Sequence, residues 1–299
     1  MSAAVDRSPA LPAPAPAPLQ AAGYWTTVWR RLRRDPVALG AGLVLVLIVL
    51  AAILAPYVAP ADPYRSSMLR RLRPIGTPGF PLGTDELGRD MLSRLIVGAR
   101  YSLLMGITPV VLAFGIGGFV GIVAGYAGGR INTAVMRTID VFYAFPSVLL
   151  AVALSGALGA GIGNALLSLT IVFIPPIARV AEAVTTQVRS RDFVEAARAS
   201  GAGALTILRV HVLGNVLGPI FVYATSLISV SMILASGLSF LGLGVRPPEP
   251  EWGLMLNTLR TAIYVQPWVA ALPGLMIFMV SIAFNLLSDG LRSAMDLKQ

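Results

Sequence analysis

The sequence has no cysteine, one histidine and one lysine, and each scarcity excludes a class of function. Without cysteine there are no disulfides, zinc–thiolate sites or cysteine nucleophiles. A histidine-based metal site is not expected, because His211 stands alone and carboxylates are scarce. An ATP-binding P-loop, G-x-x-x-x-G-K-[ST], needs a lysine, and the only one is Lys298, next to the last residue of the sequence. If ATP drives this protein, a partner must bind and hydrolyse it.

Charged residues are also scarce, at 12% of the chain, against about 25% in ordinary soluble domains. Hydrophobic residues make up 56%, and several apolar runs are long enough to cross a bilayer. This composition indicates an integral membrane protein that contacts lipid. The net charge of +9 does not favour nucleic acid as a partner, because the arginines form short clusters beside apolar runs rather than one basic face. Such clusters are typical of the cytoplasmic flanks of membrane spans.

The N-terminal part, residues 1–35, is predicted to be cytoplasmic, with a disordered tail at residues 1–22 that is rich in proline and alanine. An aromatic and basic flank follows, made of Tyr24, Trp25, Trp29, Arg30, Arg31, Arg33 and Arg34. The next apolar run, residues 37–55, is longer than the roughly 7–15 apolar residues of a signal peptide. We therefore expect a retained first transmembrane helix within residues 36–58, with its N-terminus in the cytoplasm.

Five more apolar runs predict an all-α integral membrane protein with six transmembrane helices. They lie at residues 102–126, 141–158, 165–184, 217–241 and 268–287. Six spans from a cytoplasmic N-terminus place the C-terminus and the polar stretch 189–215 in the cytoplasm as well. In the second span, Gly117, Gly121 and Gly125 recur at intervals of four, which predicts close helix packing. Arg179 and Glu182 are expected to pair on one helical face.

Residues 59–100 are predicted to be an extracytoplasmic segment that contains an amphipathic helix. Thr84 is expected to be its N-cap, with Asp85 and Glu86 in the first turn. Its apolar residues recur at helical spacing: Leu87, Met91, Leu92, Leu95 and Ile96. This pattern indicates a helix that lies on the membrane surface or against a partner.

The stretch 189–215 is a polar insert between the fourth and fifth spans, and its residues predict two short helices joined by a turn. Asp192 and Glu195 are spaced as in a capping box, and Gly201 suits a left-handed helix stop. A second helix is expected at residues 204–212. The charges alone are explained by exposed ion pairs worth about 0.3–0.5 kcal/mol each. An exposed Phe193 beside two alanines, Ala196 and Ala197, instead favours insertion into a groove of another protein.

A mildly polar stripe runs along the fifth span. Thr225, Ser229, Met232, Ser236 and Ser239 recur at intervals of four and three, which places them on one helical face. One hypothesis is that this stripe lines a translocation path. The alternative, which we favour, is helix–helix packing through small hydroxyl residues.

Several of these segments resemble importer-type ABC permeases. Glu195-Ala196-Ala197, then Gly201, then HVLGN at residues 211–215 resembles the EAA loop of that family, although Gly214 stands where the family has proline. GTDELGRDMLSRLIVGARYSL at residues 83–103 resembles the C-type permease of dipeptide, oligopeptide, nickel and glutathione importers. Further matching segments are GYAGGRIN (125–132), MRTIDVFYAFPSVLLA (136–151), LSFLGLGVRPPEPEWGLML (238–256) and FNLLSDGLR (284–292).

The resemblance implies a type I ABC importer permease fold, with residues 101–299 as a five-helix core that includes the coupling loop 189–215. It also implies a bacterial inner-membrane location and the transport of peptides, with glutathione or nickel complexes as alternatives. The implied partners are a second, homologous permease subunit, two ATPase subunits that bind ATP and Mg²⁺, and an extracytoplasmic substrate-binding protein. The chain itself is then neither an enzyme nor a cofactor-binding protein. ATPase coupling falls on Asp192, Phe193, Glu195, Ala196, Ala197 and Gly201.

A self-sufficient carrier or channel with an incidental loop is the competing hypothesis. Ion-coupled carriers generally place carboxylates or histidines in the middle of the membrane. Here the acids associated with spans, Asp140, Glu182 and Asp289, fall near predicted span ends. Their position makes the secondary-carrier hypothesis the weaker of the two.

Overall fold

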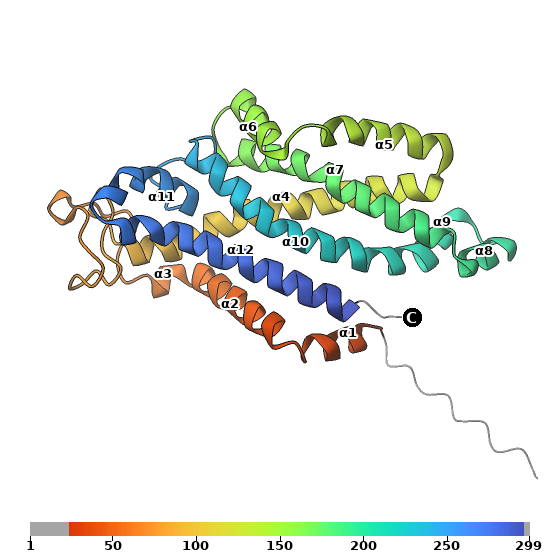
Figure 1. Cartoon of the computed structure of the whole chain (residues 1–299), viewed down its shortest axis with the longest axis horizontal. Helices are drawn as coiled ribbons and strands as arrows, with labels where there is room; N and C mark the ends of the chain where they lie inside the picture. The colour runs from red at the N-terminus through yellow and green to blue at the C-terminus, as the bar shows by residue number, and fades with distance from the viewer. Residues whose placement is uncertain (1–23, 296–299) are drawn as a thin grey trace, which may run out of the picture.

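The long helices of the protein lie side by side in one elongated bundle (Figure 1). The computed structural model describes residues 24–295, and over that range it contains helices and turns but no extended strand. Within the described range, five helical stretches are long and apolar enough to cross a membrane, or up to six if one bent pair of helices is a single span. The prediction of an all-α membrane protein is confirmed. The predicted tail at residues 1–22 lies outside the described residues.

The bundle is formed by five long helical elements. These are α2 (Pro36–Ile53), α4 (Met91–Ala127), α7 (Ile162–Arg189), α10 (Leu213–Phe240) and α12 (Pro267–Met295). The bent pair is α5 (Gly129–Tyr143) and α6 (Ser147–Leu158). Shorter elements are α1 (Tyr24–Leu32), α3 (Ala55–Val58), η1 (Met68–Arg70), α8 (Asp192–Ala199), α9 (Ala204–Thr206), η2 (Ile207–Val212), α11 (Trp252–Thr258) and η3 (Leu259–Tyr264).

The N-terminal flank is helical rather than part of a tail. Residues 24–32 form α1, and Val28 and Leu32 pack against Ala294 at the end of α12. The chain then breaks at Asp35, whose carboxylate accepts hydrogen bonds from the backbone N–H groups of Val37 and Ala38 and so caps α2. The predicted aromatic and basic flank therefore contains a helix, α1, which the sequence analysis did not assign.

The predicted amphipathic helix after Thr84 is wrong. Thr84 forms an isolated β-bridge with Asp90, and its hydroxyl donates to the Arg70 carbonyl and accepts the Arg73 N–H at 2.8 Å. The helix begins at Met91, because Asp90 accepts the Ser93 N–H at 2.8 Å and acts as the N-cap. It then continues without a break to Ala127, so the predicted boundary between residues 100 and 101 falls inside α4.

A buried ionic cluster holds the turn before α4 in place. Asp85 Oδ2 lies 2.6 Å from Arg89 Nε and 3.2 Å from Arg94 Nε, and all three side chains are at least nine-tenths buried. Arg94 also donates to the Pro63 carbonyl at 3.0 Å, which ties the start of α4 to the segment after α3. Burial, with the negative charge of Asp85, raises the pKa of the nearby Glu86 carboxyl. Asp85 and Glu86, which the sequence analysis expected in the first turn of a helix, are therefore part of a tertiary ionic cluster.

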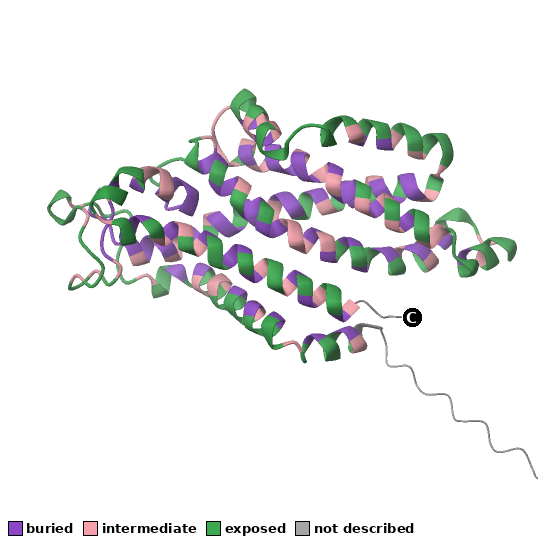
Figure 2. Cartoon of the chain, in the orientation of Figure 1, coloured by how far each residue is buried: buried purple, intermediate pink, exposed green. Residues whose placement is uncertain are grey.

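The centre of the bundle is the contact between α4 and α7, and Figure 2 shows buried residues concentrated along these helices and α10. The predicted close approach at the glycines is confirmed. A Cβ on Gly117 would lie 2.7 Å from the Ile174 carbonyl oxygen, and one on Gly125 would lie 2.7 Å from that of Glu182. At Gly121 it would overlap the Ala178 carbonyl oxygen. Small residues let the two backbones pack directly against each other.

The third predicted span, residues 141–158, is two helices rather than one. α5 ends at Tyr143, α6 begins at Ser147, and the two are bent by 83°. Pro146 lacks a backbone N–H and disfavours helical conformation at Phe145, which explains a break at this point. The sequence analysis assigned no helix to residues 129–140, which form most of α5.

Candidate functional site

The polar stretch 189–215 folds at one end of the bundle, where α8 and α9 project beyond the other helices (Figure 1). α8 covers Asp192–Ala199, so the first predicted helix is confirmed. The second, expected at residues 204–212, is not a separate helix. α9, η2 and α10 follow one another directly, and the helical run Ala204–Phe240 is continuous. Gly214, unlike a proline, keeps its N–H for the helix, which fits this continuity.

The N-terminal end of α8 differs from the expectation, and its C-terminal end agrees with it. Arg191, not Asp192, is the N-cap, and no side chain caps it; Asp192 is the first helical residue. Asp192 and Glu195 both lie in the first turn, where negative charge interacts favourably with the helix dipole. The predicted stop at Gly201 is confirmed, because Gly201 has a φ of 82°.

Gly201 closes a Schellman motif. The Ala202 N–H bonds to the Ala197 carbonyl at 3.1 Å, and the Gly201 N–H bonds to the Arg198 carbonyl at 3.0 Å. No heavy atom lies within 4 Å of a Cβ built on Gly201. Glycine is therefore favoured here by backbone conformation alone, and not by close packing.

One face of α8 is exposed and the other is anchored. Phe193 is 44% exposed, Glu195 and Ala196 are exposed, and Ala197 is half-buried. The anchor is Val194, which is fully buried in the main core. The sequence analysis missed Val194, although a lone valine among charged residues was a signal for an inward-facing position.

The exposed aromatic side chain of α8 lies near the start of the long helix. The rings of Phe193 and His211, which lies in η2, have centroids 6.4 Å apart at an angle of 43°. An apolar ring, two alanines and a carboxylate thus lie together on this projecting helix. They offer no nucleophile or acid–base pair, and among the described residues no three His, Asp or Glu side chains gather as metal ligands.

The predicted stripe on α10 faces other helices of the same chain. Thr225 Oγ1 lies 3.2 Å from Ser288 Oγ, and the Ser229 hydroxyl donates to Asn285 Oδ1 at 2.8 Å; both partners belong to α12. Met232, Ser236 and Ser239 are buried: Met232 adjoins Gly106, Ser236 adjoins Gly253, and Ser239 adjoins Gly244. These contacts are what the packing alternative expects. A role of the stripe in translocation stays a prediction.

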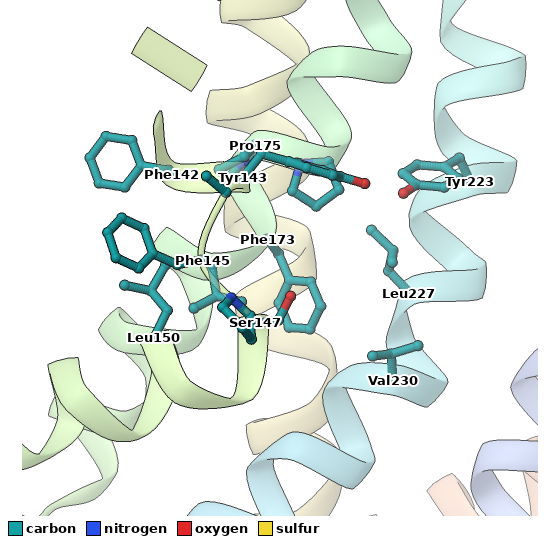
Figure 3. Close-up of a pocket in the computed structure, with 14 residues that line it drawn as sticks. Phe142, Tyr143, Phe145, Ser147, Leu150, Phe173, Pro175, Tyr223, Leu227 and Val230 are labelled. Atoms are coloured by element: carbon teal, nitrogen blue, oxygen red, sulfur yellow. The ribbon is translucent and has the colours of Figure 1, made fainter. Parts of the chain in front are cut away.

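A pocket of about 430 Å³ lies on a different face of α10 (Figure 3). α10 contributes Tyr223, Leu227 and Val230, which recur at intervals of four and three. The opposite sides come from the break between α5 and α6 and from α7, with Phe142, Tyr143, Phe145, Ser147, Phe173 and Pro175 among the lining residues. The lining carries no charge. The sequence analysis missed this surface because its residues come from four separate helices, α5, α6, α7 and α10.

An ion pair connects α5 and α7, two of the helices that line this pocket. Arg179 of α7 pairs with Asp140 of α5, and both side chains are partly exposed. The expected pairing of Arg179 with Glu182 is therefore wrong. Glu182 Oε1 instead accepts a hydrogen bond from Asn132 at 2.6 Å and one from Thr186 at 3.1 Å. Asp140 was within reach only through tertiary packing.

Comparison with known proteins gives two family matches. Residues 117–298 match the family described as binding-protein-dependent transport system inner membrane component. Residues 23–74 match the N-terminal TM domain of oligopeptide transport permease C. The two matches leave out residues 75–116, which include the buried ionic cluster and the first part of α4.

Similar proteins include curated relatives and solved structures. A di/tripeptide transport system permease protein of Pseudomonas aeruginosa is 44% identical over 275 residues, which cover 90% of this chain and 91% of that protein. A glutathione transport system permease protein of Pectobacterium atrosepticum is 41% identical over 274 residues, covering 92% and 91%. An inward-facing structure of the MetNI methionine ABC transporter matches 68% of this chain and 97% of its own, with a TM-score of 0.57 and 20% identity.

Proposed function

Because the chain belongs to the family of binding-protein-dependent transport system inner membrane components, we propose that it forms half of the pathway through which an ABC importer carries di- or oligopeptides. The chain is a multi-pass membrane protein with the fold of a type I importer permease, as the sequence predicted. The observation that carries the proposal is the anchored, projecting helix α8, which provides a docking surface for an ATPase subunit.

The proposed partners follow from what the chain itself lacks. This chain supplies one side of the proposed pathway, which includes the pocket on α10. A second, homologous permease subunit would supply the other side. Two ATPase subunits would bind ATP and Mg²⁺, since the lone lysine is not in a P-loop. An extracytoplasmic binding protein would deliver the peptide. In this assembly the chain is a permease subunit and not an enzyme.

The proposed orientation places both ends of the chain in the cytoplasm of a bacterium, with the protein in the inner membrane. It is supported by the arginines of α1 and of the 189–215 stretch. It is also supported by geometry: α1, the end of α12 and α8 lie toward the same end of the bundle, and the 59–90 segment lies at the opposite end (Figure 1).

In the mechanism that we propose, α8 couples ATP hydrolysis in the partner subunits to conformational change in this chain. When partner ATPases close and open, they move α8, and Val194 transmits this movement to the packed core. The start of α10 moves with it, since the helix is continuous from residue 204 to the pocket residues Tyr223 and Leu227. Alternation between inward- and outward-facing states would then change access to the pocket.

The docking role is tested at Gly201. Valine at a φ of 82° is a severe outlier, since left-handed conformation costs an ordinary residue about 1–2 kcal/mol and a β-branched one more. We expect Gly201→Val to lower ATP-dependent peptide uptake at least about tenfold, because 1.4 kcal/mol is a factor of ten. The matched control, Gly201→Asn, keeps most of the uptake because asparagine tolerates this conformation. The measurement is uptake into proteoliposomes of the assembled complex.

A second variant tests the chemistry of the surface rather than its backbone. Glu195→Arg reverses an exposed charge on α8 and leaves Val194 in place. We expect the ATPase subunits to stop copurifying with the tagged chain while the second permease subunit still does. If Gly201→Val and Glu195→Arg both keep full uptake and full ATPase association, the docking role is wrong and the self-sufficient carrier hypothesis gains support.

Glutathione is the second candidate substrate, because a similar permease is described as a glutathione transport protein. Glutathione and short peptides share a free carboxylate and amide bonds, so the uncharged pocket lining does not separate them. The deciding measurement is the affinity of the cognate binding protein for dipeptides and for glutathione. Tighter binding of glutathione would overturn the peptide assignment and leave the permease assignment intact.

A further inference from the structure

An apolar groove of about 390 Å³ runs between α2 and α4 on the outside of the bundle. α2 contributes Val49 and Ile53, and α4 contributes Leu103, Leu104 and Ile107. Ile53 and Leu104 are exposed, at 62% and 45%. Both helices are apolar enough to span a membrane, so this exposed groove faces hydrocarbon.

Arg100 closes one end of the groove and also lines a second hollow of about 540 Å³ beyond it. Its guanidinium donates to the carbonyls of Ala52 and Ile53, the latter at 2.8 Å, which are the last residues of α2. These two bonds use two of five N–H donors and leave the others available. A cationic side chain at the end of a membrane span lies at the level of lipid headgroups.

The second hollow also contains a carboxylate. Asp62 lines it together with Arg100, and Asp62 Oδ1 accepts the Tyr64 N–H at 2.8 Å. Within residues 24–295, neither Arg100 nor Asp62 forms an ion pair with another residue. One positive and one negative side chain therefore face the same hollow, unpaired, next to an apolar groove.

This arrangement matches a zwitterionic headgroup followed by a hydrocarbon chain. A phosphate accepts hydrogen bonds from a guanidinium in a geometry that suits both groups, and an ammonium pairs with a carboxylate. An anionic lipid without an amine would place its second polar group beside Asp62 with no charge to offset it. The same reasoning disfavours a free fatty acid, which lacks the cation.

We propose that this groove and hollow bind one phosphatidylethanolamine molecule. Its acyl chain lies along Leu104 and Ile107, its phosphate contacts Arg100, and its ammonium contacts Asp62. The bound lipid fills the space between α2 and α4 and helps hold α2 against the rest of the bundle. The lipid site is inferred from the groove and its two charged residues, and this inference does not depend on the proposed transport function. Only the assignment of the lipid to the outer leaflet rests on the orientation proposed above.

The test is lipid retention by the complex purified in mild detergent with its partner subunits. After delipidation it is incubated with equal amounts of phosphatidylethanolamine and phosphatidylglycerol, and bound lipid is counted by native mass spectrometry. We expect one retained phosphatidylethanolamine per chain and at least about tenfold less phosphatidylglycerol, equivalent to about 1.4 kcal/mol. Equal retention of the two lipids, or retention of neither, would overturn the proposal.

Three variants and one control locate the site. Arg100→Gln is expected to lose the lipid, and Asp62→Asn to lose the preference for the amine. Leu104→Trp is expected to fill the groove and so to exclude the lipid. It leaves the hydrogen bonds from Arg100 to the carbonyls of Ala52 and Ile53 in place, so a loss of lipid in this variant cannot be explained by detachment of α2 from α4. Leu275→Trp, at a position on α12 that is 51% exposed, is the matched control and is expected to retain the lipid.

The outcomes separate this proposal from the proposed transport function. If Leu104→Trp retains as much phosphatidylethanolamine as Leu275→Trp does, the lipid lies elsewhere and the site is wrong. That result would leave the proposed transport function unaffected, because transport is tested independently by the peptide uptake of the Gly201→Val variant. Conversely, a complex that imports nothing but still retains one phosphatidylethanolamine in the expected variant pattern would support the lipid site alone.

Discussion

Replacing Gly121 by leucine is expected to remove most of the folded protein from the membrane. A Cβ at this position would overlap the Ala178 carbonyl oxygen and approach the Ala181 Cβ at 2.6 Å. The obstructing atoms belong to the backbone of α7 and a short side chain, so no flexible group can move aside. Overpacking a core usually costs about 1–3 kcal/mol and occasionally more, and leucine adds four carbons at a backbone contact. We therefore expect an effect at or above the top of that range.

The measurement is the yield of monodisperse complex after detergent extraction, together with its thermal unfolding midpoint. The matched control is Gly115→Leu, six residues earlier on the same helix. No heavy atom lies within 4 Å of a Cβ built on Gly115, and this position is exposed. Equal yields of the two variants would show that α4 and α7 are not as close as the structure places them.

Replacing Asp85 by asparagine is expected to have the second large effect. The carboxylate is 2% exposed and lies within 3.2 Å of guanidinium nitrogens of both Arg89 and Arg94. Asparagine keeps an acceptor for the N–H groups of Leu87 and Arg89 but removes the charge. Removing one partner from a buried ionic cluster costs about 3–5 kcal/mol, because it leaves buried charge without compensation.

The measured quantity for this second prediction is the thermal unfolding midpoint of the detergent-solubilised complex. Asp289→Asn serves as the control, since Asp289 is exposed and surface substitutions usually change stability by less than about 0.5 kcal/mol. A midpoint for Asp85→Asn that matches the Asp289→Asn control would contradict the structural role of the cluster.

The two sequence predictions about residues 83–101 show where pattern reading failed. Thr84, Asp85 and Glu86 have the composition of a helix start, and the apolar residues after them have helical spacing. In the structure, Thr84 and Asp85 instead bind distant backbone and side-chain groups, and the helix starts at Met91, with Asp90 as its N-cap. A local pattern cannot register that a carboxylate has a tertiary partner nine residues away across a turn.

The candidate site divides in the same way. The position of α8 and the left-handed Gly201 were predicted correctly, because helix propensity and glycine conformation depend on neighbouring residues. The pocket lined by Tyr143, Phe173 and Tyr223 was not predicted, because its lining residues come from four helices that are separate in the sequence. The stripe from Thr225 to Ser239 was identified as one helical face, yet its contacts with α4, α11 and α12 became visible only in the structure.

The sequence by itself determined that this is an all-α membrane protein, where most of its spans lie, and that the given sequence contains no P-loop. These conclusions follow from the length of apolar runs, from helical periodicity and from the absence of a lysine in a P-loop, all of which are local properties. The tertiary structure alone decided which side of α10 is open, that α5 and α6 meet at 83°, and that Arg100 and Asp62 share one hollow. These features depend on distances between residues far apart in the chain, and no spacing along the sequence encodes them.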